Sequence, residues 1–458
     1  MIRNRLIIQQ TSFFLFIAVL IFLPIFTISA QELFWENPEL LVENNVWFPL
    51  TAYNEKSSII MWQEFDESDN GSVEMSISLM TAIDDKNWIK RNKVLGPFSF
   101  TGDKVSISSL VVDASGLIYI AVSSSTEGIL IYLSSDNGES FKLIGKPGGK
   151  ETTTVSPKLF ITESSSLILF VTQSVIENRT AFNQESTLGI TYSVSSNGRS
   201  WSDYVPLVSG SSLSNVYLPF HVSDRNIEHV VFQASPEESR FYQLYHISSR
   251  DRGRTWSAPA LITDIAENGN RSVDFDNQRV FLKEFRGNLY ISWERKLGNG
   301  PALSYYGELN TDTGVLNKVE AISGDGISTN PVNNPQLYIN HGIPVALWYN
   351  NIGQVVLAGR ENNEWTGIDI PGQTVGGLSN FCRFLSVGNE MNIVWQSDIG
   401  ENTGLTRLTQ DKTVSDITVF PVNFKSSALS QDRYTVSWDL PSDSSGIAGF
   451  SYSLDRNE

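Results

Sequence analysis

Few side chains in this 458-residue chain belong to types that commonly perform chemistry, and carboxylates are the main candidates among them. The chain has four histidines and one cysteine, Cys382. A single cysteine excludes an internal disulfide framework and a cysteine-rich zinc or iron–sulfur site. Glu64 and Glu294 each follow an apolar segment that ends in tryptophan, where two carboxylates could act on a glycosidic bond. The alternative is that each is a loop acid in an acidic protein.

Three basic residues near the starts of other apolar segments could bind an anion. Lys158, Arg279 and Arg383 occupy matching positions in three of the repeated units described below, and fixed cationic groups bind carboxylates and phosphates. His221 begins a further segment and is the fourth candidate ligand-binding residue. The alternative is that these residues are solvated charges, or a packed histidine, at a rim.

The motifs of cofactor and metal sites are missing from the sequence. We find no nucleophile elbow, phosphate-binding loop or dinucleotide fingerprint. Residues 66–71 resemble a calcium loop, but the closing glutamate is absent. The sequence therefore predicts neither a cofactor nor a metal site.

The composition is that of a globular, acidic, all-β protein. Hydrophobic residues make up 41% and charged residues 18% of the chain, and 33 basic against 50 acidic residues give a net charge of −17. This balance argues against a nucleic-acid partner, which requires a basic surface, and against an anionic membrane surface. The abundance of tryptophan, glycine and serine is typical of β-structure.

The first thirty residues have the pattern of a secretory signal peptide. Arg3 and Arg5 precede a nearly continuous apolar stretch, and Ala30 ends a run of small residues. We therefore expect a protein that is secreted or held in the cell envelope, in the periplasm or on the outer surface. The alternative is an uncleaved membrane anchor, which would then be the chain's contact with a membrane.

A hairpin-like unit of about 14 residues recurs seven times. Each unit begins with a small or helix-breaking residue and ends in an aromatic or small apolar one, and the fifth carries one extra residue that we place in its turn, Arg286-Gly287-Asn288. The copies span residues 49–62, 108–121, 157–170, 219–232, 279–293, 335–348 and 382–395. Their ends are 47 to 62 residues apart, the size of a four-stranded propeller blade. The sequence predicts a β-propeller with seven blades, with six as the alternative.

A second motif follows several of the hairpins. Residues 249–256 fit the pattern Ser-x-Asp-x-Gly-x-Thr-Trp throughout, and residues 134–141 fit with Ser and Phe as the final pair. In residues 194–201, Val194 and Ser196 replace the Ser and the Asp. We expect the short polar side chains to bond turn amides and the aromatic residue to fill the space between sheets. The residues given this structural role are Ser134, Asp136, Gly138, Phe141, Gly198, Trp201, Ser249, Asp251, Gly253 and Trp256.

These motifs resemble the Asp-box, or BNR, repeats of sialidase-like β-propellers, and we assign residues 31–414 to such a domain. The resemblance implies a role in folding, because Asp boxes occur in propellers of unrelated function. Sialidases resemble one another in a first-blade aromatic-Arg-Ile-Pro motif whose arginine binds the substrate carboxylate. Here the corresponding residues are 46–49, and Trp47 stands in place of that arginine. This departure puts sialidase activity in doubt.

The last segment, residues 415–458, has a different pattern. Residues 417–422, 434–438 and 445–455 read as three strands, and Trp438 resembles the buried aromatic of a fibronectin type III domain. A complete sandwich needs about 100 residues, so we expect further chain beyond Glu458 in the natural protein.

Taken together, these patterns predict an exported, non-enzymatic propeller that acts as a recognition or scaffold module for a protein or a glycan at the cell envelope. The alternative is a glycoside hydrolase with a sialidase-like fold and altered specificity. The arrangement of the basic residues separates the two. Convergence of Lys158, Arg279 and Arg383 in one pocket beside Glu64 or Glu294 would favour the enzyme, whereas separate rim positions would exclude it.

Overall fold

The computed structural model describes residues 34–411, apart from 68–70, 83–86, 100–105, 149–153, 177–185, 209–212, 237–238, 240, 267–268, 312, 325–326, 329, 341, 371–378, 388–389 and 401. The predicted signal peptide and the predicted fibronectin-like segment lie outside the described residues. Within the described part of the chain, no helix is long and apolar enough to cross a membrane.

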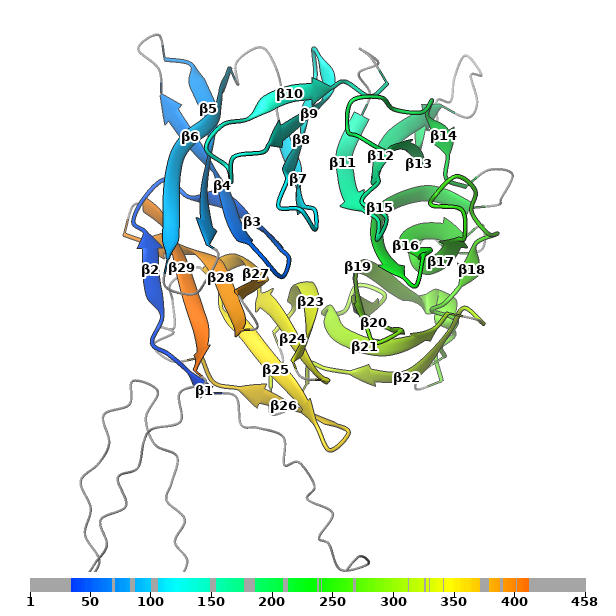
Figure 1. Cartoon of the computed structure of the whole chain (residues 1–458). Helices are drawn as coiled ribbons and strands as arrows, with labels where there is room; N and C mark the ends of the chain where they lie inside the picture. The colour runs from blue at the N-terminus through cyan, green and yellow to red at the C-terminus, as the bar shows by residue number, and fades with distance from the viewer. Residues whose placement is uncertain are drawn as a thin grey trace, which may run out of the picture. The chain divides into compact units, whose positions relative to one another are not determined.

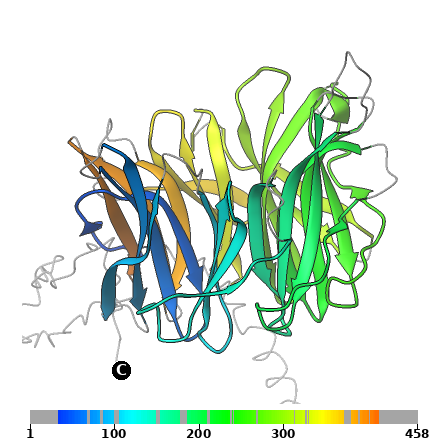
Figure 2. The same ribbon diagram turned by 90° about the horizontal axis from the view of Figure 1, so that it is seen from above.

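Seven antiparallel sheets form a ring of propeller blades (Figure 1). Six blades have four strands in chain order, and the strand nearest the ring axis is the first in each. Figure 2 shows the blades turned by 90°, with strands of neighbouring blades side by side. The predicted all-β propeller is confirmed, and the number of blades is seven rather than six.

The strands of the first three blades have the following bounds. Blade 1 contains β3 (Trp47–Tyr53), β4 (Ser58–Glu67), β5 (Val73–Ala82) and β6 (Trp88–Ser99). Blade 2 contains β7 (Ser106–Val112), β8 (Ile118–Ser124), β9 (Gly128–Ser134) and β10 (Lys142–Gly145). Blade 3 contains β11 (Thr154–Ile161), β12 (Leu167–Ile176), β13 (Ser186–Ser195) and β14 (Val205–Pro206).

The next three blades follow the same order. Blade 4 contains β15 (Leu213–Asp224), β16 (Ile227–Pro236), β17 (Gln243–Ser249) and β18 (Ala260–Leu261). A short 3-10 helix, η1 (Ser272–Asp274), leads into blade 5, which contains β19 (Phe275–Phe285), β20 (Asn288–Leu297), β21 (Leu303–Asn310) and β22 (Val315–Ala321). Blade 6 contains β23 (Val332–Asn340), β24 (Ile343–Asn350), β25 (Val355–Glu361) and β26 (Glu364–Ile368).

Blade 7 is built from both ends of the described chain. It contains β27 (Ser379–Val387), β28 (Glu390–Ile399) and β29 (Asn402–Asp411), and its outer edge is completed by β1 (Phe34–Trp35) and β2 (Glu39–Val42). Phe34 lies opposite Asp411 and Glu39 lies opposite Arg407. The N-terminal strands thus close the ring by pairing with the last strand.

The hydrophobic core lies between neighbouring blades rather than in the middle of the ring. Apolar clusters join side chains of blades 1 and 2, 2 and 3, 3 and 4, 4 and 5, 5 and 6, and 7 and 1. Trp62, Trp293 and Trp348, each near the middle of a second strand, have no exposed surface. Burial of such large apolar side chains is the main stabilising contribution to blade packing.

The second motif forms the turn that we predicted. The hydroxyl of Ser249 donates to Asp251, and the Asp251 carboxylate accepts from the amides of Arg254 and Thr255 at 3.0 and 2.9 Å. Gly253 adopts a φ of +78°, which suits glycine, and its amide donates to Ser249. The aromatic residue of the motif, Trp256, packs between blades 3 and 4.

The third copy of this turn differs from the sequence interpretation. Ser195 and Asn197, rather than Val194 and Ser196, take the positions of Ser and Asp. The hydroxyl of Ser195 accepts from the amide of Gly198, and the side-chain oxygen of Asn197 accepts from the next two amides at 2.9 Å. This turn is one residue shorter, so a fixed-length motif missed it.

Each inner strand contains a β-bulge near its start, which shifts the pairing with its neighbour. In six of the bulges one residue has a φ of about +50°, an unfavourable conformation for residues with a side chain. These residues are Phe48, Asn215, Leu218, Arg279, Asn334 and Phe381. Strand β15 contains two of the six bulges. A bulge reorients side chains at the end of a strand, so these positions shape one mouth of the ring.

The fifth hairpin shows the effect of the bulge on the apparent repeat. Phe285 pairs with Asn288, so its turn has only two residues, Arg286 and Gly287. The extra residue that we placed in this turn belongs instead to the bulge at Arg279. The repeated block itself begins at Val280 and has the same length as the others.

Candidate functional site

A cavity of about 380 Å³ lies on the ring axis and contains all three predicted cations. Lys158 of β11, Arg279 of β19 and Arg383 of β27 line it together with side chains of β3, β15 and β23. Blades 3, 5 and 7 therefore each contribute one positive charge to one space. The described lining residues include no aspartate or glutamate.

The cations in this central cavity influence one another. Burial, together with the nearby Arg383, lowers the pKa of Lys158 to about 8. Arg383 donates from Nη1 to the carbonyl oxygen of Cys382 at 2.8 Å, which fixes its guanidinium. Because like charges are held close together in a partly desolvated space, an anion bound there would be strongly favoured.

A fourth cation, Lys283, was not among the predicted residues and contacts a residue that lines the cavity. Its Nζ donates to the hydroxyl of Tyr53 at 3.2 Å and lies 5.3 and 5.8 Å from the ring centroids of Tyr53 and Tyr338. Tyr53 lines the cavity. Strand alternation could have identified Lys283 from the sequence. Residues two positions apart in a strand face the same side, and Lys283 follows the cavity residue Phe281 by two positions in β19.

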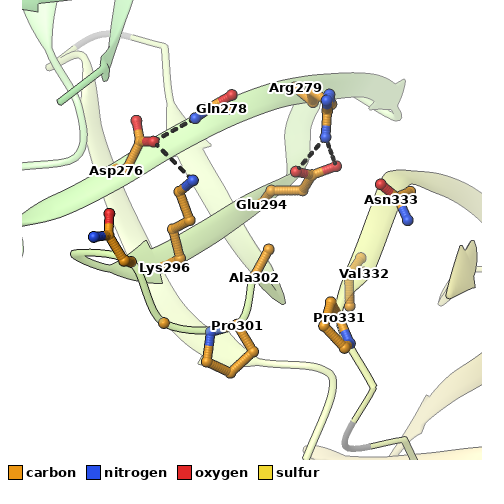
Figure 3. Close-up of a pocket in the computed structure, with 12 residues that line it drawn as sticks. Asp276, Gln278, Arg279, Glu294, Lys296, Pro301, Ala302, Pro331, Val332 and Asn333 are labelled. Atoms are coloured by element: carbon orange, nitrogen blue, oxygen red, sulfur yellow. Dashed lines mark hydrogen bonds and ion pairs between the residues drawn. The ribbon is translucent and has the colours of Figure 1, made fainter. Parts of the chain in front are cut away.

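A second hollow of about 480 Å³ adjoins the cavity at Arg279 (Figure 3). We call it the lateral groove. Its floor is the paired strands β19 and β20, and its sides are residues 299–302 and 331–333. These segments are the loop between the second and third strands of blade 5 and the start of the inner strand of blade 6.

The predicted carboxylate Glu294 lies between the two hollows and is bound by Arg279. Nη1 of Arg279 is 3.0 and 2.7 Å from the two carboxylate oxygens, and the amide of Asn334 donates to one of them at 2.8 Å. Burial raises the pKa of Glu294, while Arg279 acts in the opposite direction. Burial outweighs the pairing with Arg279, so the pKa of Glu294 is raised overall.

Asp276 is a second carboxylate in the lateral groove that the sequence analysis did not select. It accepts hydrogen bonds from the amide of Tyr242 at 2.9 Å and from Gln278, and its carboxylate lies 3.4 Å from Nζ of Lys296. The residue opposite Gln278 is Glu294, so Asp276 and Glu294 share one face of the sheet as diagonal neighbours. Such diagonal neighbours are roughly 7–8 Å apart, and somewhat less at Cβ.

The basic residue adjacent to Glu294 in sequence does not belong to this site. Successive strand residues point to opposite faces, and Arg295 is buried on the other side with its guanidinium over the ring of Phe275 at 3.8 Å. Arg279, distant in sequence, takes its place beside Glu294. The residue that pairs with Glu294 therefore cannot be identified from its neighbours in the sequence.

The three predicted cations do not occupy equivalent register positions, contrary to our expectation. Arg383 lies opposite Val394 in blade 7, and the equivalent residue of blade 5, opposite Ser292, is Phe281. Arg279 lies in the bulge before it. The bulge nevertheless directs Arg279 into the same cavity.

The other two predicted site residues lie elsewhere. Glu64 of blade 1 accepts a hydrogen bond from Nε1 of Trp62 at 3.0 Å, and neither hollow includes it among its described lining residues. His221 is buried, and its Nε2 is 2.7 Å from Oε2 of the buried Glu228. Neither residue is brought to the cations.

Neither a metal cluster nor a reactive cysteine is evident in the described residues. In that part of the chain, no group of three or more His, Cys, Asp or Glu side chains could hold a metal ion. Cys382 is fully buried at the start of an inner strand, and burial raises the pKa of its thiol to about 12. The thiol is therefore protonated at neutral pH.

Comparisons with known proteins show only shared folds. No protein-family model and no curated protein sequence matches the chain. Similar solved structures include an α-L-arabinanase of Penicillium chrysogenum, with 13% identity, a TM-score of 0.44 and coverage of 84% of this chain and 98% of that one. A protein of unknown function from Dyadobacter fermentans has 11% identity, a TM-score of 0.46 and coverage of 84% and 99%. A Trypanosoma rangeli sialidase has 13% identity, a TM-score of 0.40 and coverage of 80% and 55%.

Proposed function

We propose that this chain is an exported recognition propeller that binds an anionic group in its central cavity. The observation that carries the proposal is the convergence of Lys158, Arg279 and Arg383 on one cavity whose described lining includes no carboxylate. The chain as a whole carries a net charge of −17. Glu294 pairs with Arg279, and a bound anion would offset the repulsion between Lys158 and Arg383.

The shape of the cavity supports a small, well-defined anion. Its volume of about 380 Å³ is within the range of small-molecule sites. Guanidinium groups bind carboxylate, sulfate and phosphate oxygens through paired hydrogen bonds, and a lysine adds a point charge. The class of ligand that fits is therefore a carboxylate, sulfate ester or phosphate ester carried by a larger molecule.

Calorimetric titration with glucuronate, and with uncharged glucose as its neutral counterpart, tests this proposal. We expect glucuronate alone to bind. Lys158→Gln and Arg383→Lys should each weaken binding by about tenfold or more, because each removes a desolvated charge or its fork geometry. Lys142→Gln, at an exposed position of β10, is the control. The proposal would be overturned if glucose bound as tightly as glucuronate. It would also be overturned if neither Lys158→Gln nor Arg383→Lys changed the affinity for glucuronate.

We expected three cations in one pocket beside Glu294 to favour an enzyme, and the central cavity meets that description. Carbohydrate cleavage is therefore our second candidate function. Asp276 and Glu294 lie diagonally on one sheet face in the lateral groove, and roughly 6.5–9.5 Å between carboxyl groups suits an inverting glycosidase. Burial raises the pKa of Glu294, as a general acid requires. Arg279 opposes this role because it favours the ionised form of Glu294, so binding without cleavage is our first proposal.

Hydrolysis of fluorogenic glycosides by the purified chain separates the two functions. Glu294→Gln removes the acid and keeps the shape, and Glu64→Gln is the matched control in blade 1. Turnover that is lost in Glu294→Gln and kept in Glu64→Gln would make glycoside hydrolysis, rather than binding alone, the function of the protein. No turnover, with glucuronate binding intact, supports recognition alone.

The place of action follows from the N-terminal pattern. We propose that residues 1–30 direct export and are removed, and that the ligand belongs to a glycan or protein at the cell envelope. N-terminal sequencing of the protein recovered from envelope fractions tests this. A mature chain that begins at Gln31 is the expected result, and a retained Met1 would support the uncleaved anchor.

A further inference from the structure

A continuous row of aromatic rings runs from the central cavity across the mouth of the ring. The row consists of Tyr349, Phe381, Phe48, Trp47 and Phe65, and we call it the aromatic row. Successive ring centroids lie 5.9, 4.9, 6.4 and 6.3 Å apart. The row crosses from blade 6 through blade 7 to blade 1.

Two members of the row are exposed despite their size. Trp47 is 36% and Phe48 is 42% exposed, whereas Trp62 of the same blade is fully buried. Isolated exposed apolar residues are common, but contiguous exposed aromatic surfaces usually mark binding sites. The exposed part of the row therefore needs an explanation other than blade packing.

Backbone strain is what brings the row together. Trp47 and Phe48 are consecutive in β3, so regular strand geometry would direct them to opposite faces. The bulge between Trp47 and Leu50, with a φ of +52° at Phe48, instead places their rings in contact. Phe381 has the same φ of +52° in the bulge of β27. Strain of this kind accumulates at functional sites.

The row is continuous with the cationic cavity. Asn334 lines the cavity and donates from its side-chain amide to the hydroxyl of Tyr349 at 3.2 Å. Phe381 precedes the cavity residue Arg383 by two positions, and Phe48 precedes the cavity residue Leu50 by two. A ligand whose charged group lies in the cavity would extend onto these rings.

We infer that the ligand is an acidic oligosaccharide, with a charged sugar in the cavity and the adjoining sugars stacked on the aromatic row. This inference rests on the proposed anion-binding function. The C–H face of a pyranose packs on an aromatic ring, while its hydroxyl groups remain hydrated or bond to nearby amides. Phe48 and Trp47 present open rings beside the amide of Gln396, whose Oε1 already accepts from the Phe48 amide at 3.1 Å.

Charge complementarity selects this occupant over others. A neutral apolar chain would gain nothing from the positive charge in the cavity, and a small inorganic anion would leave the rings of Trp47 and Phe48 exposed. A second copy of this acidic protein would be repelled by net charge. An acidic oligosaccharide provides a negative charge for the cavity and sugar faces that cover the aromatic row.

The test compares galacturonate oligomers of one, two and four units by calorimetry and by tryptophan fluorescence. We expect affinity to rise by about tenfold or more from one unit to four. Trp47→Ala should abolish that rise and leave the affinity for the single unit unchanged, and Trp47→Phe should restore part of it. Thermal unfolding and sedimentation velocity of each variant verify that the fold and the oligomeric state are intact.

The outcomes separate this inference from the proposed function. If a single galacturonate binds through Lys158 but the longer oligomers bind no more tightly, the inference fails and the anion site stands. A length dependence that survives Trp47→Ala overturns the inference in the same way. If no galacturonate binds, the proposed function fails and the inference with it. A self-association that Trp47→Ala abolishes would identify the row as a contact between copies and overturn the inference.

Discussion

Arg279 and Glu294 join the central cavity to the lateral groove, because one guanidinium nitrogen donates to both carboxylate oxygens at 3.0 and 2.7 Å. Arg279 lines both hollows, and its side chain is 41% exposed, whereas that of Glu294 is 7% exposed. The carboxylate therefore holds part of the positive charge that the cavity could offer to a ligand. The first prediction tests this competition.

Replacing Glu294 by Gln should strengthen anion binding while weakening the fold slightly. The substitution keeps an oxygen that can accept from the amide of Asn334 but removes the charge that competes for Arg279. We expect the affinity for glucuronate to increase by about threefold to tenfold at low salt. The free energy of unfolding should fall by about 1 kcal/mol, since Arg279 is partly solvated. Calorimetry and urea denaturation measure the two effects, and a weaker affinity would contradict the competition.

Anion binding should weaken as the pH rises through about 8. The pKa of Lys158 is lowered to about 8 by burial and by Arg383, so the free protein loses this charge in that range while a bound anion favours the protonated form. The affinity for glucuronate should therefore be nearly constant below pH 7 and fall between pH 8 and 10. In Lys158→Arg the decline should disappear, because arginine stays charged throughout. If the affinity of Lys158→Arg fell over the same pH range, a group other than Lys158 would be responsible for the pH dependence.

Acid should destabilise blade 4 through two stacked histidines. His229 and His246 are buried with ring nitrogens 3.1 Å apart, and burial lowers their pKa values to about 4 and about 3. The unfolded chain binds these protons at about pH 6.5, so stability is fully present above that pH. It should fall as the pH drops toward 4 and 3, by up to about 1.4 kcal/mol per pH unit for each histidine.

Urea denaturation between pH 7 and 4, compared with His246→Gln, isolates this contribution. The variant should show a smaller loss of stability over that range. Carboxylates common to both proteins titrate equally and cancel in the difference. Equal pH slopes would show that the histidines do not carry the effect.

The turn after β17 should tolerate asparagine but not alanine at position 251. The Asp251 carboxylate accepts from the amides of Arg254 and Thr255 and from the hydroxyl of Thr255 at 2.6 Å. In blade 3, Asn197 serves two amides with its single side-chain oxygen. Asp251→Asn should therefore cost less than about 0.5 kcal/mol and Asp251→Ala about 1–2 kcal/mol of unfolding free energy. Similar losses in the two variants would show that the oxygen is not what stabilises the turn.

The sequence was sufficient for the architecture because blades repeat. Spacing of tryptophans such as Trp62 and Trp293, and alternation within hairpins, predicted the strands and the seven blades, and these positions are buried as expected. The convergence of Lys158 and Arg383 could be anticipated because both lie just after the bulge of an inner strand, at the second position of a repeated unit. Because the blades repeat, a local sequence pattern is enough to predict which residues, distant in the sequence, lie close together in the ring.

The details of the site could not be predicted because they depend on register. A single bulge moves Arg279 out of the repeat position and into the mouth of the ring, and another turns Phe48 beside Trp47. The first event leaves only an extra residue in the fifth unit, which we placed in the turn, and the second leaves no signal in composition or periodicity. The pairing of Glu294 with Arg279, and the inclusion of Asp276, follow from those shifts rather than from sequence proximity.

The pairing of β1 and β2 with β29 has a consequence for how the protein forms. Phe34 pairs with Asp411, so this contact can form only after nearly the whole domain is available. Contacts of such high sequence separation slow folding. Until this pairing forms, the outer edge of β29 is unpaired and open to association with other chains. A chain that emerges gradually can complete blades 1 to 6 in order, but its last cooperative step is delayed until almost the whole domain has been made. Deleting residues 34–42 should therefore slow refolding and promote aggregation far more than the loss of two short strands would suggest.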